Sequence, residues 1–366
     1  MFFVKRFLLC ALLWNLCACA AATPTTAPAA SPTPSFVSAP TLVALPTSQF
    51  IEATPNVPPV LRGTFVYGAG DGSLWLQQAS GGDAMPFVER STESIAQMPA
   101  FSPDGKSVAY AALLFLADGN LRGDIRLMDG DGKNVRTLLR AQANDEVYWY
   151  PRFARDGRML VTHVRNSQMT NERAALEWLD VPSGKTTRVI DDARDGDVAR
   201  DGKWIAFVRY DVTTMRSSLW LANADGMNAQ PLVDDKTFNA ILNPRFSPDG
   251  KWLAFSVHGA PQKNLPQASR EQCGLSILVF CLAQTAHAHS APGALWRVNL
   301  ETKTFQQLTD IYDDSPTPAW SSDGAYIAIH DFTGIRLIDL ARQEIYPLFL
   351  ENGGSGGFDW QRTGNR

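Results

Sequence analysis

A β-hairpin unit that recurs along most of the chain is the sequence feature that most restricts its fold. Asn243 to Val257, with the sequence NPRFSPDGKWLAFSV, is typical of a short strand, a tight turn and a second strand with alternating side chains. Ser247 to Gly250 place Ser, Pro, Asp and Gly where a type I turn favours them. Four variants of this unit begin at Pro99, Pro151, Gly196 and Pro318. The sequence therefore predicts five complete hairpins.

A second repeat alternates with the first and consists of a strand, a polar turn and a further strand. Its six copies begin at Leu74, Arg126, Glu177, Leu219, Leu295 and Arg336. Six copies of one half and five of the other leave two incomplete hairpins, Gly63 to Tyr67 near the start and Phe358 to Gln361 near the end. Pairing of these two segments would complete a sixth four-stranded sheet and remove an exposed sheet edge.

The predicted fold is an all-β, six-bladed β-propeller with four-stranded antiparallel blades, closed by pairing of the N- and C-terminal strands. Repeats of about 40 to 50 residues with four short strands are typical of propeller blades. We expect a single propeller domain at residues 60–366, with an insertion at residues 258–293, and we expect it to be a monomer.

The start of the chain has the features of an export signal. Lys5 and Arg6 precede an apolar run that is too short for a transmembrane helix, so we predict a signal peptide at residues 1–18. Leu16 to Cys19 resembles the lipobox of bacterial lipoproteins, which predicts acylation of Cys19; an ordinary cleaved signal peptide is the alternative. The Ala-, Thr- and Pro-rich residues 19–59 are predicted to form a tether, because such a composition cannot bury a core.

Charge and cysteine content restrict the partners. The chain has 33 basic and 37 acidic residues, and loss of Lys5 and Arg6 would change its formal charge from −4 to −6. With no basic run, nucleic acid is not expected as a partner. Cys273 and Cys281 remain after export and acylation, and we predict a disulfide between them. Two reduced core cysteines are the alternative.

Long insertions between the second and third strands of a blade are expected on one face of the ring. They are Ala112 to Gly123, Arg165 to Ala175 and His258 to Gly293. Long loops on a rigid scaffold often bind partners, which makes this face a candidate binding surface. Insertion without a function is the alternative.

Charged positions in the innermost strands are a second candidate site. Arg152, Asp197, Arg245 and Asp359 occupy equivalent positions in different repeats, and we expect them at the mouth of the central channel, on the same face as the long loops. Tyr148 and Trp149 are expected at that face as a binding rim. A structural ion-pair network and packing between blades are the respective alternatives.

The two repeats resemble the propeller repeats of the TolB family and of prolyl-oligopeptidase-type enzymes. The resemblance covers about residues 60 to 362, and Pro99 to Tyr110 and Pro244 to Phe255 match closely. TolB itself has an additional N-terminal α/β domain where this chain has its tether. The resemblance implies the fold and leaves the function open, because the shared residues build turns and cores.

Two functions are compatible with these features. The first is a non-enzymatic binding protein, exported and lipid-anchored at the outer face of the cytoplasmic membrane or in the cell envelope, that binds a protein or peptide partner through its long-loop face. The second is a propeller enzyme, a lyase or hydrolase acting on glycans or peptides at the channel mouth. A purely structural or sensing module is a further alternative. No zinc-type spacing occurs among the five histidines, so neither a metal nor a cofactor is expected.

Overall fold

The computed structural model describes residues 50–52, 58–117, 119–165, 173–258, 293–309, 316–350 and 353–361. Within these ranges the regular elements are twenty-five β-strands, without an α-helix, which confirms the predicted all-β class. The described part of the chain accordingly offers no helix that could cross a membrane. Contacts divide the chain into residues 1–38 and 39–366, and every described residue belongs to the second unit.

Four of the five sheets each contain four antiparallel strands that lie side by side. The sheet with the order β25-β2-β3-β4 contains Phe358–Trp360, Thr64–Gly68, Leu74–Gln78 and Met85–Val88. The sheet of β13 to β16 contains Arg194–Val198, Trp204–Asp211, Arg216–Asn223 and Gln230–Val233. The sheet of β17 to β20 contains Ala240–Phe246, Trp252–His258, Gly293–Asn299 and Phe305–Gln307. The sheet of β21 to β24 contains Thr317–Trp320, Tyr326–Asp331, Gly334–Asp339 and Glu344–Phe349, with β1, Ile51–Glu52, added beside β24.

The fifth sheet is eight-stranded and consists of two antiparallel groups. One group, β5 to β8, contains Ser94–Phe101, Ser107–Phe115, Leu121–Asp129 and Arg136–Leu139. The other, β9 to β12, contains Val147–Phe153, Met159–Arg165, Arg173–Asp180 and Lys185–Asp191. A single parallel pair, Gly123 with Val147, joins β7 to β9.

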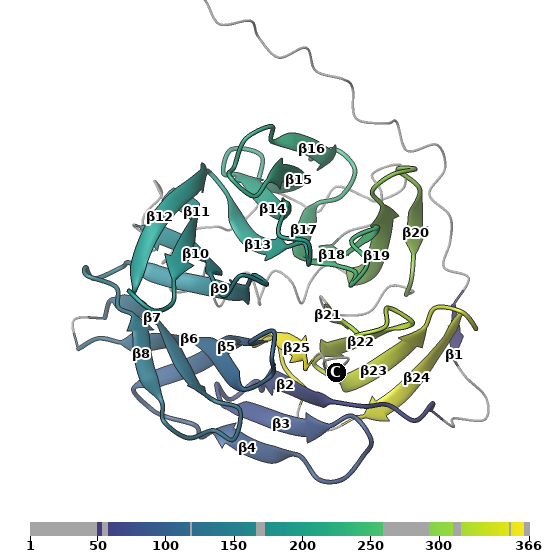
Figure 1. Cartoon of the computed structure of the whole chain (residues 1–366), viewed down its shortest axis with the longest axis horizontal. Helices are drawn as coiled ribbons and strands as arrows, with labels where there is room; N and C mark the ends of the chain where they lie inside the picture. Colours follow the sequence, from purple (N-terminus) through teal and green to yellow (C-terminus); the bar gives the residue numbers. More distant parts are fainter. Residues whose placement is uncertain are drawn as a thin grey trace, which may run out of the picture. The chain divides into compact units, whose positions relative to one another are not determined.

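The sheets are arranged around a central axis as a β-propeller. Figure 1 shows β5, β9, β13, β17, β21 and β25 nearest the centre, while β4, β8, β12, β16, β20 and β24 lie at the periphery. Adjacent sheets are held together by apolar side chains. One cluster joins Val208 and Leu219 to Phe255 and Trp296 of the next sheet. The core is therefore distributed between sheets, and each sheet depends on its neighbours.

The pairing of the two chain ends is confirmed. Phe65, Val66 and Tyr67 of β2 pair with Trp360, Asp359 and Phe358 of β25. The Phe65 ring lies 5.4 Å from that of Phe358 and 4.9 Å from that of Trp360, and Trp360 Nε1 donates a hydrogen bond of 3.0 Å to the carbonyl oxygen of Arg62. This contact joins segments from opposite ends of the folded chain.

The folded part begins earlier than the predicted boundary at residue 60. Ile51 and Glu52 pair in parallel with Glu344 and Ile345 of β24. Phe50 is 4% exposed and packs in the same apolar cluster as Ile345. An aromatic side chain and two backbone pairs attach this part of the predicted tether to the last sheet.

The recurring turn has the hydrogen bonds that its sequence predicts. In the turn after β17 the N–H of Gly250 donates to the carbonyl oxygen of Ser247 at 2.9 Å. The Ser247 hydroxyl donates to Asp249 Oδ1 at 2.6 Å and accepts from the N–H of Trp252 at 2.9 Å. The serine thus connects the turn to the second strand, which explains its repeated occurrence.

The first of the three predicted long insertions is shorter than expected. Most of Ala112 to Gly123 extends β6 and β7, which pair as far as Phe115 with Leu121. The antiparallel ladder of β6 and β7 continues through most of this segment, so only the residues between Phe115 and Leu121 form the connection. The residues between β10 and β11 and those between β18 and β19 lie outside the described ranges.

Candidate functional site

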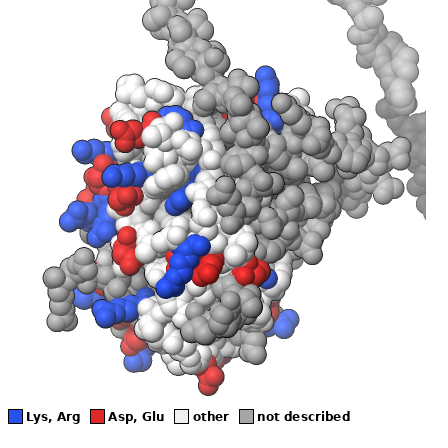
Figure 2. Space-filling model, turned by 90° about the vertical axis from the view of Figure 1, so that its right-hand side faces the viewer, with Lys and Arg blue, Asp and Glu red and all other residues white. Residues whose placement is uncertain are grey.

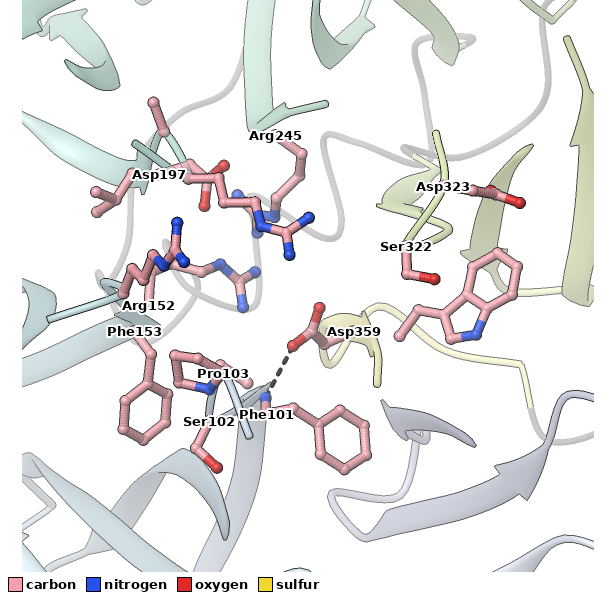
Figure 3. A pocket seen from close by; sticks show the side chains of 16 residues that line it. Phe101, Ser102, Pro103, Arg152, Phe153, Asp197, Arg245, Ser322, Asp323 and Asp359 are labelled. Carbon is pink, nitrogen blue, oxygen red and sulfur yellow. Dashed lines mark hydrogen bonds between the residues drawn. The ribbon is translucent and has the colours of Figure 1, made fainter. Parts of the chain in front are cut away.

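A pocket of about 230 Å³ lies where the innermost strands reach the hairpin turns. Its walls come from the ends of β5, β9, β13, β17 and β25 and from the turns that follow β5, β9, β13 and β21. Its charged lining residues are Arg152, Arg155, Arg200, Arg245, Asp197, Asp323 and Asp359. Figure 3 shows Arg152 and Arg245 directed toward the middle of the pocket from one side, with Asp359 facing them.

A bulge in the innermost strands sets the direction of these side chains. The pairing register shifts near the end of β5, β9, β13 and β17. Left-handed backbone conformations, with φ between 47° and 91°, occur at Met98, Tyr150, Asp195, Asn243 and Gly357. Each lies two positions before a pocket residue, namely Ala100, Arg152, Asp197, Arg245 and Asp359. An extra residue in one strand reorients the side chains that follow it. The bulge therefore directs the side chain two positions later toward the channel.

The two inner arginines are buried and only partly hydrogen-bonded. Arg152 is 5% exposed and Arg245 is 7% exposed. Arg152 Nη1 donates to the carbonyl oxygen of Pro99 at 3.2 Å, and Arg245 Nη1 donates to that of Pro244 at 2.6 Å. The Nε and Nη2 atoms of both arginines make no hydrogen bond to any described residue. A buried donor without an acceptor is destabilising, which makes these four nitrogen atoms notable.

Two aspartates of the pocket connect neighbouring sheets. Asp197 Oδ2 accepts a hydrogen bond of 2.8 Å from the N–H of Phe246, and Asp359 Oδ2 accepts one of 2.8 Å from the N–H of Phe101. The dashed line in Figure 3 marks the second of these. Each carboxylate therefore satisfies a backbone N–H of the next innermost strand and has a structural role.

Asp195 lies behind Arg245 and supplies part of its counter-charge. It is 2% exposed, its Oδ1 lies 3.5 Å from Arg245 Nη1, and its Oδ2 accepts a hydrogen bond from the N–H of Asn243. Burial raises the pKa of Asp195, and the nearby arginines oppose this effect. Asp195 thus places a negative charge next to Arg245, and among the described residues it forms no ion pair with Arg152.

Burial also affects Arg152. Loss of hydration lowers the pKa of Arg152 to about 10, and repulsion from Arg245 acts in the same direction, while Asp359, Asp197 and Asp195 oppose it. Arg152 stays protonated at neutral pH, because this pKa is well above 7. Among the described residues it has no carboxylate at ion-pair distance, so its charge is balanced only by neighbours further away.

Four of the six predicted site residues meet at this pocket, and its location differs from the prediction. Arg152, Asp197, Arg245 and Asp359 all line it. The sequence analysis expected them on the long-loop face, but they lie at the opposite, turn end of the channel. The physical reason is their position in the strand, since β13 ends at Val198, directly after Asp197, and the turn residue Arg200 lines the same pocket.

Tyr148 and Trp149 do not line the pocket. Tyr148 is 6% exposed and stacks on His163 with 4.3 Å between ring centroids. Trp149 is 8% exposed and packs with Met98, Leu113 and Val147. Both aromatic residues pack within the protein, as the alternative interpretation of the sequence proposed.

His163 forms a second buried polar cluster, with Tyr148 stacked on it. His163 Nε2 lies 2.7 Å from Glu146 Oε1 and Nδ1 lies 2.7 Å from Glu177 Oε1. Burial by itself raises the pKa of Glu146, but hydrogen bonds from the N–H groups of Gln142 and Ala143 and from His163 outweigh it and lower this pKa. All partners of the imidazole are internal, which fits a stabilising network in β9 to β11.

The sequence analysis missed three charged residues of the site. Arg155 and Arg200 are the second residues of their turns, where proline stands in Ser102 to Gly105, and Asp195 lies at the bulge. An arginine at the turn position that proline occupies in other repeats distinguishes Arg155 and Arg200 in the sequence, and this difference could have identified them as site residues. Asp is among the residue types enriched at positive φ, which was a weaker signal for Asp195.

Several predicted sites lie outside the described residues. They are Cys19, Cys273 and Cys281, and the long segment between β18 and β19. Among the described residues, no group of three or more His, Cys, Asp or Glu side chains is arranged to hold a metal ion. Figure 2 shows acidic and basic side chains interspersed on the face that it displays.

Comparison with known proteins supports the propeller fold. No protein-family model matches this sequence. A protein from Sulfurisphaera tokodaii named as a Tricorn-like protease N-terminal subunit is 33% identical over 103 residues, which cover 28% of this chain and 51% of that protein. The chain thus matches about half the length of this curated relative.

Among solved structures, TolB from Acinetobacter baumannii aligns with a TM-score of 0.60 and 15% identity, covering 84% of this chain and 69% of TolB. A chain of a nidogen–laminin complex aligns with a TM-score of 0.56 and 13% identity, covering 82% of this chain and 99% of its own length. Identities this low establish similarity of fold, and the resemblance to TolB and other β-propellers stands at that level.

Proposed function

We propose that this chain is an exported, membrane-anchored, non-enzymatic binding protein that holds a protein or peptide partner at the turn end of its propeller channel. The observation that carries the proposal is the pocket with two buried arginines whose Nε and Nη2 atoms have no partner among the described residues. Donors arranged this way are suited to recognising a ligand. The binding surface is therefore assigned to the pocket and not to the long-loop face.

The proposed architecture has six blades. The two antiparallel groups of the eight-stranded sheet, β5 to β8 and β9 to β12, count as separate blades because one parallel pair joins them. Together with the four remaining sheets they account for both sequence repeats. An experimental structure of the propeller would count the blades directly, and a different number would refute this assignment.

Export and anchoring are proposed from the N-terminal sequence. A signal peptide at residues 1–18, acylation of Cys19 and a tether from residue 19 to the start of the fold near Phe50 would hold the propeller outside the membrane. Metabolic labelling with a palmitate analogue tests this, because Cys19→Ala should abolish labelling while Cys273→Ala should leave it intact. Equal labelling of the two variants would refute the anchor.

The comparisons support a role in binding at the level of the fold. One similar structure comes from a complex of two proteins, nidogen and laminin, and the curated relative is named as a subunit of a protease. Both names describe proteins that belong to an assembly with another chain. For this chain we infer a partner that presents an extended segment, because a pocket of about 230 Å³ accommodates part of a chain and not a folded surface.

Site-specific photocrosslinking tests the proposed location. A photoreactive amino acid at Arg200, which is exposed and lines the pocket, is compared with one at Val212, which is 59% exposed at the opposite end, between β14 and β15. Crosslinking in the cells that produce the full chain should yield a defined adduct at Arg200 only, with the modified peptide of the partner identified by mass spectrometry. An adduct at Val212 only would return the site to the long-loop face and refute the proposal.

A further inference from the structure

We propose that Arg152 and Arg245 bind the side-chain carboxylate of an Asp or Glu residue of the partner segment. This inference rests on the proposed function, because it names the group that a peptide partner inserts into the pocket. This chemistry follows from the donors, acceptors and charges that line the pocket.

The first step is the count of donors. A guanidinium group carries five N–H donors, and the described hydrogen bonds of Arg152 and Arg245 involve only the Nη1 atom of each. The Nε and Nη2 atoms lie on one edge of a guanidinium and point in nearly parallel directions. That edge matches the two oxygen atoms of a carboxylate, which makes a bidentate contact possible at either arginine.

The second step is that the carboxylates near the arginines accept backbone N–H groups, and none of them is hydrogen-bonded to Nε or Nη2 of Arg152 or Arg245. One oxygen of Asp197 and one of Asp359 accept backbone N–H groups of neighbouring strands, at 2.8 Å each. Asp195 contacts Arg245 through Nη1, at 3.5 Å, and leaves the Nε and Nη2 edge unpaired. The protein therefore supplies counter-charge near the arginines without filling their hydrogen-bonding edges.

The third step is the sign of the charge. The lining contains four arginines and three aspartates, and Asp195 beside Arg245 balances the fourth positive charge, so the preference for an anion depends on the closeness of the two inner arginines. Arg152 and Arg245 are more than nine-tenths buried, where repulsion between them is screened less than at the surface. An anion placed between them accepts their free N–H groups and also relieves that repulsion, whereas a neutral carbonyl accepts the hydrogen bonds without relieving it and a cation increases it.

Calorimetric titration of the full chain in detergent tests the proposal. The probes are two acetylated and amidated heptapeptides of Gly and Ser that differ only in a central Glu or Gln, with sodium acetate and inorganic phosphate as free anions. The Glu peptide should bind at least about tenfold more tightly than the Gln peptide, as expected for one charge-assisted hydrogen bond. Equal affinities would overturn the proposal.

Conservative variants separate recognition from folding. Arg152→Lys and Arg245→Lys keep the charge and remove the planar edge, so each should weaken binding of the Glu peptide about tenfold. Arg158→Lys is the matched control, because Arg158 stacks on Trp178 outside the pocket and should leave binding unchanged. A control variant that weakens binding as much as the pocket variants would overturn the assignment.

A gain of affinity provides a test that misfolding cannot imitate. Asp359→Asn keeps an oxygen acceptor for the Phe101 N–H and removes a negative charge that faces the arginines. The Glu peptide should bind several-fold more tightly to this variant, while its affinity should fall if the pocket instead receives a cationic group. An affinity that does not rise, in a variant whose melting temperature is unchanged, would refute the inference.

The outcomes distinguish this inference from the proposed function. If a partner crosslinks at Arg200 but the Glu and Gln peptides bind alike, the binding role stands and the carboxylate assignment fails. If acetate or phosphate binds and neither peptide does, the site is one for a free small anion, and the inference of a peptide carboxylate fails. If the Glu peptide is preferred and Arg200 yields no adduct, the carboxylate site stands and the protein partner fails.

Discussion

Replacing Phe358 by alanine tests how strongly β25 closes the ring. Phe358 has no exposed surface, and its ring centroid lies 5.4 Å from that of Phe65 and 5.7 Å from that of His330. Removing most of the ~150 Å² that a buried phenylalanine contributes, at roughly 25 cal/mol per Å², should lower the free energy of unfolding by about 3 to 4 kcal/mol. This matches the range of about 3–5 kcal/mol found for such substitutions in protein cores.

Equilibrium unfolding in urea, followed by tryptophan fluorescence, measures the effect. The matched control is Phe115→Ala, because Phe115 is 42% exposed at the end of β6 and its replacement should change the free energy of unfolding by less than about 0.5 kcal/mol. If both variants unfold at the same urea concentration, the contact between β25 and β2 does not hold the ring together.

Three further changes test other parts of the structure. Asp197→Ala should lower the free energy of unfolding by about 1–3 kcal/mol more than Asp197→Asn, because alanine leaves the Phe246 N–H without its acceptor; equal melting temperatures would contradict this. Gly357→Ala should lower the free energy of unfolding by at least about 1 kcal/mol, since φ is 91° and the new Cβ would lie 2.7 Å from the Cα atom of Met98. An unchanged melting temperature would refute this strain. Hydrogen bonds that include the one with His163 lower the pKa of Glu146 in the folded protein. The ionised carboxylate therefore stabilises the fold above its ordinary pKa of about 4.3, and this stabilisation is lost as the pH falls below that value. Between pH 6 and 3 the free energy of unfolding should fall more steeply for the unmodified protein than for Glu146→Gln, and parallel curves would contradict this.

Much of the fold could be predicted because its signals are local. Pro and Gly in the Ser-Pro-Asp-Gly turns restrict the backbone, and the strands beside them alternate in side-chain character, so Ser247 to Gly250 could be interpreted without knowledge of distant residues. Closure by Phe358 followed from counting incomplete repeats. The attachment of Phe50 to β24 had no such signal, because one buried aromatic residue in a Pro-rich segment does not form a pattern.

The candidate site was predicted in its members and not in its geometry. Equivalent positions in the repeats identified Arg152, Asp197, Arg245 and Asp359, and the structure brings these residues to one pocket. Their face was wrong, because the bulge two residues earlier and the nearness of the strand end determine where a side chain points. Tyr148 illustrates the same limitation, since its neighbour across the sheet, His163, determines that it packs inside.

The sequence by itself determined the strands, the turns and the closing of the chain ends, because these depend on backbone preferences and on the count of repeats. Only the tertiary structure decided that Arg152 and Arg245 lie together with partly unpaired guanidinium groups. The physical reason is that the groups around each arginine come from other innermost strands: Pro99 of β5 accepts a hydrogen bond from Arg152 of β9, and Asp195 of β13 lies beside Arg245 of β17. The burial, the charge balance and the unpaired hydrogen-bond donors of this site exist only where those strands come together. They cannot be inferred from any one segment of the sequence.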